Sequence, residues 1–347
     1  MTGHSQDNQD GAAALARRDL FRSLATVAAG LAAAGAVNPA IADDNSQGSG
    51  RVRRFIRQVS NARIFDLAPV WDENSPIASV NPPYSMFLNA THASTRGAFG
   101  DGGKLSFTSE IQQFSGQHGA PSIDAIGHIG RDGKLFGGID AAAATSDTRG
   151  IGRSGVGANL DITHFPNGRL VNRGVMLDVA RFVNGDLTPL PQQFEITGQH
   201  LERTARAQRV DLERGDTILI RTGWGQYFTP NPALYKGDFS PGPGVDGAQF
   251  LVRAGASAVG ADTLTFEQRP PLFGTPGTPS FQVFPVHMLL IADNGINIIE
   301  NYFLEELAEA RVYEFLLVVP PLKIRGGTGS ALRSFALVPG PDRDDDN

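Results

Sequence analysis

The sequence of 347 residues contains no cysteine. This absence excludes disulfide-stabilised folds, thiolate metal sites and cysteine nucleophiles, so any metal site must use histidine, aspartate and glutamate. Basic runs suited to a phosphate backbone are also absent, and the formal net charge is −6, which argues against nucleic-acid binding. No G-x-S-x-G motif supports a serine hydrolase, and the two G-x-G-x-x-G matches, at 150–155 and 242–247, follow no convincing strand.

The N-terminal segment has the layout of an export signal. Arg17 and Arg18 precede a short apolar run at 24–37, which is followed by Ala40 and Ala42 in an A-x-A arrangement. The paired arginines and the Ala/Gly-rich run resemble a twin-arginine signal. A membrane anchor is the alternative, but the run is shorter than the ~20 residues needed to span a bilayer.

These features divide the chain into four parts. We expect a twin-arginine-type signal peptide at 1–42, a polar and basic linker at 43–60, one globular domain at 61–339 and an acidic tail at 340–347. The mature protein is then expected in the periplasm or outside the cell, with no membrane attachment after the signal is removed.

The globular part mixes strand and helix patterns. Short apolar, β-branched runs predict strands at 63–68, 174–180, 216–223, 296–300, 314–319 and 334–339. Helical patterns with capping signals lie between some of them, at 197–208, 246–255 and 285–295. The mixture predicts an α/β fold with long loops.

Two histidines bracket an aspartate in the small and apolar stretch "GQHGAPSIDAIGHIG". His118, Asp124 and His128 follow the spacing H-x5-D-x3-H, and imidazole and carboxylate are the ligands that suit Zn²⁺ or Mn²⁺ where thiolates are absent. An ionised carboxylate among isoleucines needs a compensating partner. The alternative is a turn-capping Asp124 with histidines in ordinary hydrogen bonds, and the spacing alone leaves both interpretations open.

A second polar pair interrupts an apolar segment near the C-terminus. His287 stands near the start of the helical pattern, and Glu300 ends the apolar strand pattern. A glutamate there needs a cation or several hydrogen-bond donors. A metal and a structural salt bridge to an arginine both satisfy that need.

These segments resemble the cyclase family of metal-dependent hydrolases, which includes kynurenine formamidases and isatin hydrolases. The first segment resembles the family motif H-x-G-T-H-x-D-x-P-x-H, and "PVHMLLIADNGINIIENYFLEEL" resembles the closing segment. Further matches fall in the family's order: "FDLAPVW", "NRGVMLDVARF", "GDTILIRTGWGQYF" and "VGADTLTFE". The resemblance implies a swivelling β/β/α domain, a divalent metal (Zn or Mn) and a homo-oligomer.

The resemblance also implies roles for individual residues. His118, Asp124, His287 and Glu300 fall on metal-ligand positions, and His128 falls on the position of the general acid/base. One position departs from the pattern, because Ser122 stands where the family has its second metal histidine. The site then holds a single ion, or a more oxygen-loving ion such as Mn²⁺, or it has lost catalysis and kept only the fold.

The function implied is that of an exported metal-dependent hydrolase. We expect it to cleave a small amide, lactam or ester, in the manner of an arylformamidase, with metal-activated water. The alternative is a catalytically inactive, cyclase-like protein that binds a small molecule, and lyase or dehydratase chemistry cannot be separated from hydrolysis by sequence. Trp71, Tyr84 and Phe87 are candidates for an apolar substrate wall, with an ordinary core role as the alternative.

Overall fold

The computed structural model describes residues 46–145 and 155–339, and the chain divides into two compact units, Met1–Ser60 and Asn61–Asn347. The predicted signal peptide (1–42) and acidic tail (340–347) lie outside the described residues. In the first unit the structure describes one helix, α2 (Ser46–Ser60), where we expected a linker. Polar and basic composition concealed the helical spacing of Val52, Phe55 and Ile56. None of the helices in residues 46–145 and 155–339 has the length and hydropathy of a membrane-spanning helix.

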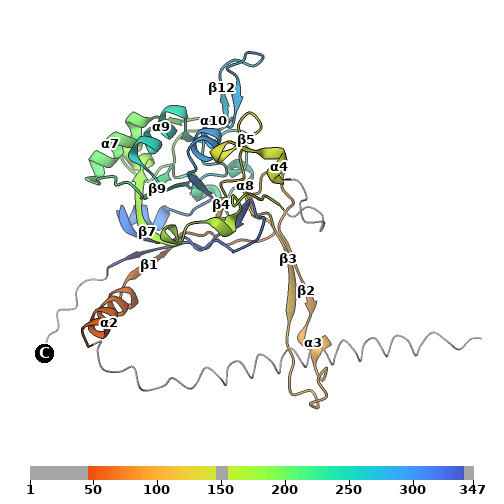
Figure 1. The fold of residues 1–347 in the computed structure, drawn as a ribbon. Coiled ribbons are helices and arrows are strands. Elements are labelled where there is room, and N and C mark those ends of the chain that lie inside the picture. Colours follow the sequence, from red (N-terminus) through yellow and green to blue (C-terminus); the bar gives the residue numbers. More distant parts are fainter. Residues whose placement is uncertain (1–45, 146–154, 340–347) are drawn as a thin grey trace, which may run out of the picture. The chain divides into compact units, whose positions relative to one another are not determined.

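The second unit is built on one nine-stranded sheet (Figure 1). Its strands lie in the order β1 (Arg63–Asp66), β17 (Phe335–Val338), β15 (Glu314–Val318), β7 (Val171–Asp178), β9 (Thr217–Arg221), β11 (Ala258–Ala261), β14 (Asn297–Glu300), β4 (Ser122–Asp124) and β16 (Gly329–Ala331). The four central strands, β7, β9, β11 and β14, run parallel, and the remaining pairings are antiparallel.

The central strands are buried on both faces. In β9, Ile218 and Ile220 pack into one apolar core, while Leu219 between them packs into a second core on the opposite face. The first core is covered by α7 (Gly198–Gln208), α9 (Val245–Ala254), α10 (Pro285–His287) and the π-helix η4 (Met288–Asp293). Figure 1 shows α7 and α9 side by side.

The other elements are short and connect or flank the sheet. They are β2 (Ser85–Ala90), α3 (His92–Thr95), β3 (Ser109–Gln113), β5 (Lys134–Leu135), η1 (Phe136–Gly138), β6 (Ile139–Asp140), α4 (Ala141–Thr145), η2 (Ile162–His164), α5 (Asn167–Leu170), α6 (Val179–Asn184), β8 (Glu195–Ile196), η3 (Trp224–Tyr227), α8 (Pro232–Tyr235), β10 (Gly242–Pro243), β12 (Leu272–Phe273), β13 (Gln282–Val283) and α11 (Glu305–Glu309).

The strands and helices expected from the sequence are all confirmed, with bounds that differ by up to three residues at either end. The segment 285–295 differs in its type of helix: we expected an α-helix, and one α-helical turn continues as a π-helix. Three strands of the nine-stranded sheet were not predicted: β4, β11 and β16. They have only three or four residues each, and β11 (AVGA) and β16 (GSA) lack the bulky β-branched runs that indicate strands.

A two-stranded hairpin, β2–β3, extends away from the sheet (Figure 1). Phe87 pairs with Ile111 across the hairpin, and both side chains are exposed, as are Met86 and Leu88. These apolar side chains therefore contribute nothing to the cores that surround the sheet.

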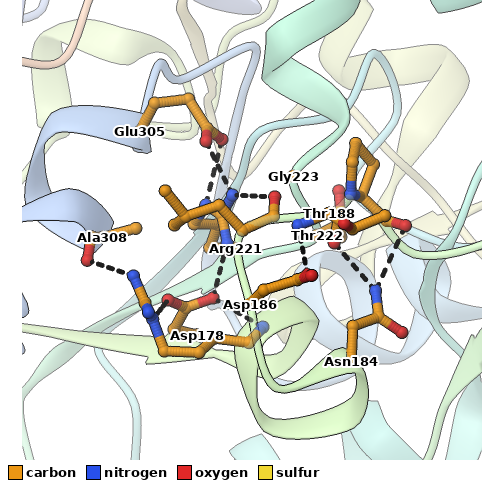
Figure 2. Close-up of polar contacts among 12 residues, drawn as sticks. Asp178, Asn184, Asp186, Thr188, Arg221, Thr222, Gly223, Glu305 and Ala308 are labelled. Carbon is orange, nitrogen blue, oxygen red and sulfur yellow. Dashed lines mark hydrogen bonds and ion pairs between the residues drawn. The ribbon is translucent and has the colours of Figure 1, made fainter.

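A fully buried arginine joins the carboxyl ends of two central strands to α11 (Figure 2). Arg221, the last residue of β9, donates to both carboxylate oxygens of Glu305 at 3.0 and 2.6 Å and to Asp178 at 2.7 Å. A fourth bond reaches the carbonyl oxygen of Leu187 at 2.9 Å. The guanidinium thereby compensates carboxylates that burial alone would make costly.

Replacing this arginine tests its structural role. Arg221→Met leaves Glu305 without its cation and Asp178 with Arg181 alone, so we expect the free energy of unfolding to fall by about 3–5 kcal/mol in urea titrations. The matched change Arg206→Met removes an exposed pair with Glu202 and should cost no more than about 0.5 kcal/mol. Equal effects of the two substitutions would contradict a structural role for the network.

Candidate metal centre

Sheet register brings two carboxylates to the same face. Ser122 lies directly opposite Glu300 in the antiparallel pair of β4 and β14, and Ile123 lies opposite Ile299. The two isoleucines point into the second core, so Ser122, Asp124 and Glu300 point the other way. Glu300 also ends a parallel strand, and sites in parallel sheets form at such ends.

Asp124, His287 and Glu300 form a compact and buried cluster. One ligand atom from each lies within 4.8 Å of the others. His287 Nε2 is 3.3 Å from Glu300 Oε1 and 3.8 Å from Asp124 Oδ2. The helix that carries His287 covers the face on which the carboxylates emerge, which is why residues distant in sequence meet here.

Asp124 provides the test of whether a cation fits this cluster. Both of its carboxylate oxygens are buried, and neither has a hydrogen-bond partner among the described residues. Burial accordingly raises the pKa of Asp124. A buried carboxylate without a hydrogen bond costs several kcal/mol, whereas a divalent cation bound between Asp124, His287 and Glu300 removes that cost. The donor set of two carboxylates and an imidazole suits such an ion.

Glu267 orients His287 and was missed by the sequence analysis. Its carboxylate accepts a hydrogen bond from His287 Nδ1 at 2.5 Å, and it also accepts the backbone N–H groups of His287 and Val286 at 3.1 and 3.3 Å. Nδ1 is thereby occupied, and Nε2 is left as the atom that faces the cluster. Such carboxylate–histidine pairs fix metal-ligating imidazoles in proteins. The one sequence signal was a glutamate within the apolar stretch "TLTFE".

His118 joins the cluster through Glu300 rather than through Asp124. Its Nδ1 lies 2.6 Å from Glu300 Oε2. Burial lowers the pKa of His118, but the Glu300 carboxylate outweighs it and the pKa rises to about 9. Burial raises the pKa of Glu300, but His118 and His287 outweigh it and bring it to about 2. Without a cation, protonated histidines therefore balance Glu300, while Asp124 has no partner within hydrogen-bond distance.

Two neighbouring carboxylates also raise the pKa of His287. Burial lowers its pKa, but hydrogen bonds to Glu267 and Glu300 raise it to about 10. A metal ion binds the neutral imidazole, so metal binding at this cluster displaces protons.

His128 stands between the cluster and a cavity of about 580 Å³. Its Nε2 lies 4.0 Å from Asp124 Oδ1, and its ring centroid is 5.6 Å from that of His118. His118, His128 and His287 all line the cavity. Gly127 permits this placement, because a Cβ atom there would lie 2.6 Å from a methyl group of Val156. The arrangement places an imidazole at the cavity wall beside the carboxylates.

Ser122 lies beside the cluster without belonging to it. Its Oγ accepts a hydrogen bond from the backbone N–H of His118 at 3.3 Å. The hydroxyl thus holds the turn that leads from His118 to β4. No second group of three potential ligands was found among the described residues, so the geometry defines one ion site.

The backbone next to several site residues adopts the left-handed conformation. His118 has a φ of 55°, Phe266 before Glu267 has 52°, and Asn301 after Glu300 has 61°. Each such residue costs about 1–3 kcal/mol and persists only where its surroundings impose it. The Asn301 side chain shows how: it donates to Ala120 O at 3.0 Å and accepts from the Tyr235 hydroxyl at 2.9 Å.

The three aromatic candidates for a substrate wall are not among the residues that line this cavity. Trp71 stacks against Tyr84 with ring centroids 4.7 Å apart, and Phe114 meets Trp71 edge-on at 5.4 Å. Phe87 lies on the exposed β2–β3 hairpin. The aromatic ring that does line the cavity is Phe284.

The fold and the site together define a metal-binding α/β protein. A family model described as "Putative cyclase" matches residues 63–268, which is more than half of the chain. The chain therefore belongs to the putative cyclase family, and the expected fold class is confirmed.

Known proteins resemble different shares of the chain. The isatin hydrolase of Roseibium aggregatum is 29% identical over 143 residues, which cover 38% of this chain and 49% of that protein. The match thus spans about half the length of this relative. A crystal structure of a novel cyclase is 27% identical, with a TM-score of 0.66 over 83% of this chain and 91% of that one. An isatin hydrolase bound to the product analogue thioisatinate shares the fold, with 20% identity and a TM-score of 0.59 over 86% of this chain and 99% of that one.

Removing the charge of Asp124 should change stability and metal binding in opposite directions. We expect Asp124→Asn to raise the free energy of unfolding of the metal-free protein by about 1–3 kcal/mol, because it replaces a buried carboxylate that accepts no hydrogen bond by a neutral group of similar size. The same substitution should abolish the rise in melting temperature that Zn²⁺ or Mn²⁺ causes in the wild type. A mutant that is still stabilised by metal would show that the ion binds elsewhere.

Glu267 should affect metal affinity without being a ligand. Glu267→Gln weakens the hydrogen bond that fixes His287, so calorimetric titration with Zn²⁺ or Mn²⁺ should give an affinity about 10–100-fold lower at unchanged stoichiometry. Glu309→Gln, an exposed change on α11, is the control and should leave the affinity unchanged. Loss of the site altogether would make Glu267 a ligand, and no effect would remove it from the site.

Proposed function

We propose that this protein is a metal-dependent hydrolase of a small amide, lactam or ester. The observation that carries the proposal is the buried Asp124–His287–Glu300 cluster, which lies beside a cavity lined by His128. A cavity of about 580 Å³ is of the size that binds small molecules. The family and the partial match to an isatin hydrolase, whose name denotes action on a lactam, support the same reaction class.

Each residue at the site has a separate task. Asp124, His287 and Glu300 hold the divalent cation, which when bound supplies an activated water and polarises the scissile carbonyl. His128 takes a proton during attack and returns one to the leaving amine or alcohol. His118 fixes Glu300 through its 2.6 Å contact, and Glu267 fixes His287.

We further propose that the site holds one ion, Zn²⁺ or Mn²⁺. Two carboxylates and one histidine leave an open coordination position, which is the arrangement of catalytic zinc sites. The oxygen-rich donor set equally accepts Mn²⁺. Arylformamidase-like cleavage, of a C–N bond outside a peptide, is the specific reaction we expect of this site.

Ser122 favours the second candidate function, a binding protein without catalysis. Its hydroxyl accepts a hydrogen bond from the backbone of His118, and it stands where a metal histidine was expected.

A substrate screen separates the two candidate functions. It uses metal-loaded protein with formanilide, isatin and 4-nitrophenyl acetate. Turnover that stops on chelation supports the hydrolase, whereas metal binding without turnover of any of the three supports the binding protein.

His128 should affect the reaction while leaving metal binding intact. We expect His128→Ala to lower kcat about 10²–10⁴-fold, because a positioned general acid/base is removed, at an unchanged metal content. His92→Ala changes an exposed histidine on the hairpin side of the molecule and is the matched control. An unaffected kcat in His128→Ala would assign proton transfer to another group.

We also propose export by the twin-arginine route. Arg17 and Arg18, the short apolar run at 24–37 and the A-x-A arrangement support this proposal. Export of folded protein suits a chain that acquires its metal before it crosses the membrane.

A further inference from the structure

One part of the cavity wall is cationic. Lys236 and Arg269 line the same cavity as the three histidines, and Asp238 is the acidic residue beside them. Much of the remaining wall is apolar, with Ile129 and Phe284 among its residues. The cavity therefore combines an apolar surface, His287 of the metal cluster and, apart from the histidines, two cationic side chains against one carboxylate.

Arg269 is held in place by contacts that leave its charge uncompensated. Its backbone N–H donates to Ser240 O at 3.0 Å, and its Nη1 donates to the carbonyl oxygen of Lys236 at 3.2 Å. No carboxylate of the described residues forms an ion pair with Arg269 within 4.0 Å. Burial lowers the pKa of Arg269, opposed by the more distant carboxylates of Asp238 and Glu300.

Other arginines in the described part of the chain contrast with Arg269. Arg173, Arg181 and Arg221 each contact a carboxylate at 3.2 Å or less. A half-buried guanidinium without such a contact keeps free N–H groups for a ligand. The planar fork of a guanidinium matches a carboxylate in two parallel hydrogen bonds, which makes the carboxylate the natural ligand.

Resting on the proposed hydrolase function, we propose that Arg269, assisted by Lys236, binds a carboxylate of the substrate. The preferred substrate is then an amide, lactam or ester with an apolar body and a carboxylate away from the scissile bond. Arg269 sets specificity, while the metal cluster and His128 perform the chemistry.

The test compares two formamides that differ by one para carboxylate group: formanilide and 4-formamidobenzoate. In metal-loaded wild type we expect a lower KM for 4-formamidobenzoate. Arg269→Gln should raise that KM about 10–100-fold, as expected for a lost charge-assisted hydrogen bond, and leave kcat and the formanilide reaction unchanged. Arg269→Lys keeps the charge without the fork and should be intermediate. Arg206→Gln, an exposed change on α7, should have no effect.

A binding experiment separates failure of this proposal from failure of the proposed function. If the wild type hydrolyses neither formamide, titration with unreactive 4-phenylbutanoate and 4-phenylbutanamide still tests the carboxylate site in the metal-loaded protein. Tighter binding of the acid that is lost in Arg269→Gln supports the site. Equal binding of acid and amide, or an acid preference that survives in Arg269→Gln, overturns it.

Discussion

The central constraint in this structure is the buried carboxylate of Asp124. Asp124 is the last residue of strand β4, which lies between the two apolar cores. Neither of its carboxylate oxygens has a hydrogen-bond partner among the described residues. The negative charge of Glu300, on the neighbouring strand, is compensated by hydrogen bonds to two histidines. The charge that lacks a hydrogen bond therefore lies on Asp124. A divalent cation resolves this imbalance and gives the cluster its chemistry at the same time. The molecule gives up stability at this position to keep a binding site, as functional sites commonly do.

The rest of the second unit keeps the Asp124 carboxylate and its neighbours in position. The antiparallel register of β4 against β14 sets Ser122 opposite Glu300, and a slip of one residue would turn the carboxylates into the apolar core. The helix that carries His287 packs through Leu290 and Ile291 onto the same face. Glu267 then fixes the imidazole, and left-handed residues next to the site mark where the backbone is forced into position. The Arg221 network secures the carboxyl ends of β7 and β9, two central strands of the same sheet.

Much of this arrangement could be predicted from the sequence, because long apolar strands and capped helices leave clear periodic patterns. Asp124 and Glu300 stood out as charges in apolar runs, and resemblance to a family connected them with His287. Three features left no comparable pattern. Strand β11 is made of small residues, Glu267 acts through contacts with Val286 and His287 across 19 and 20 positions, and the ring that lines the cavity is Phe284 rather than Trp71, Tyr84 or Phe87. Contacts across such separations depend on tertiary packing, which local patterns do not encode.

The most direct test of the account is the metal content of the protein purified without chelator, measured by elemental analysis. The geometry of one cluster predicts about one Zn²⁺ or Mn²⁺ per chain, released by chelation and rebound on addition of the metal. A protein that carries no divalent metal and fails to take up either ion would contradict the account. Asp124 would then be a buried carboxylate without a cation, and Ser122 would mark a site that no longer functions.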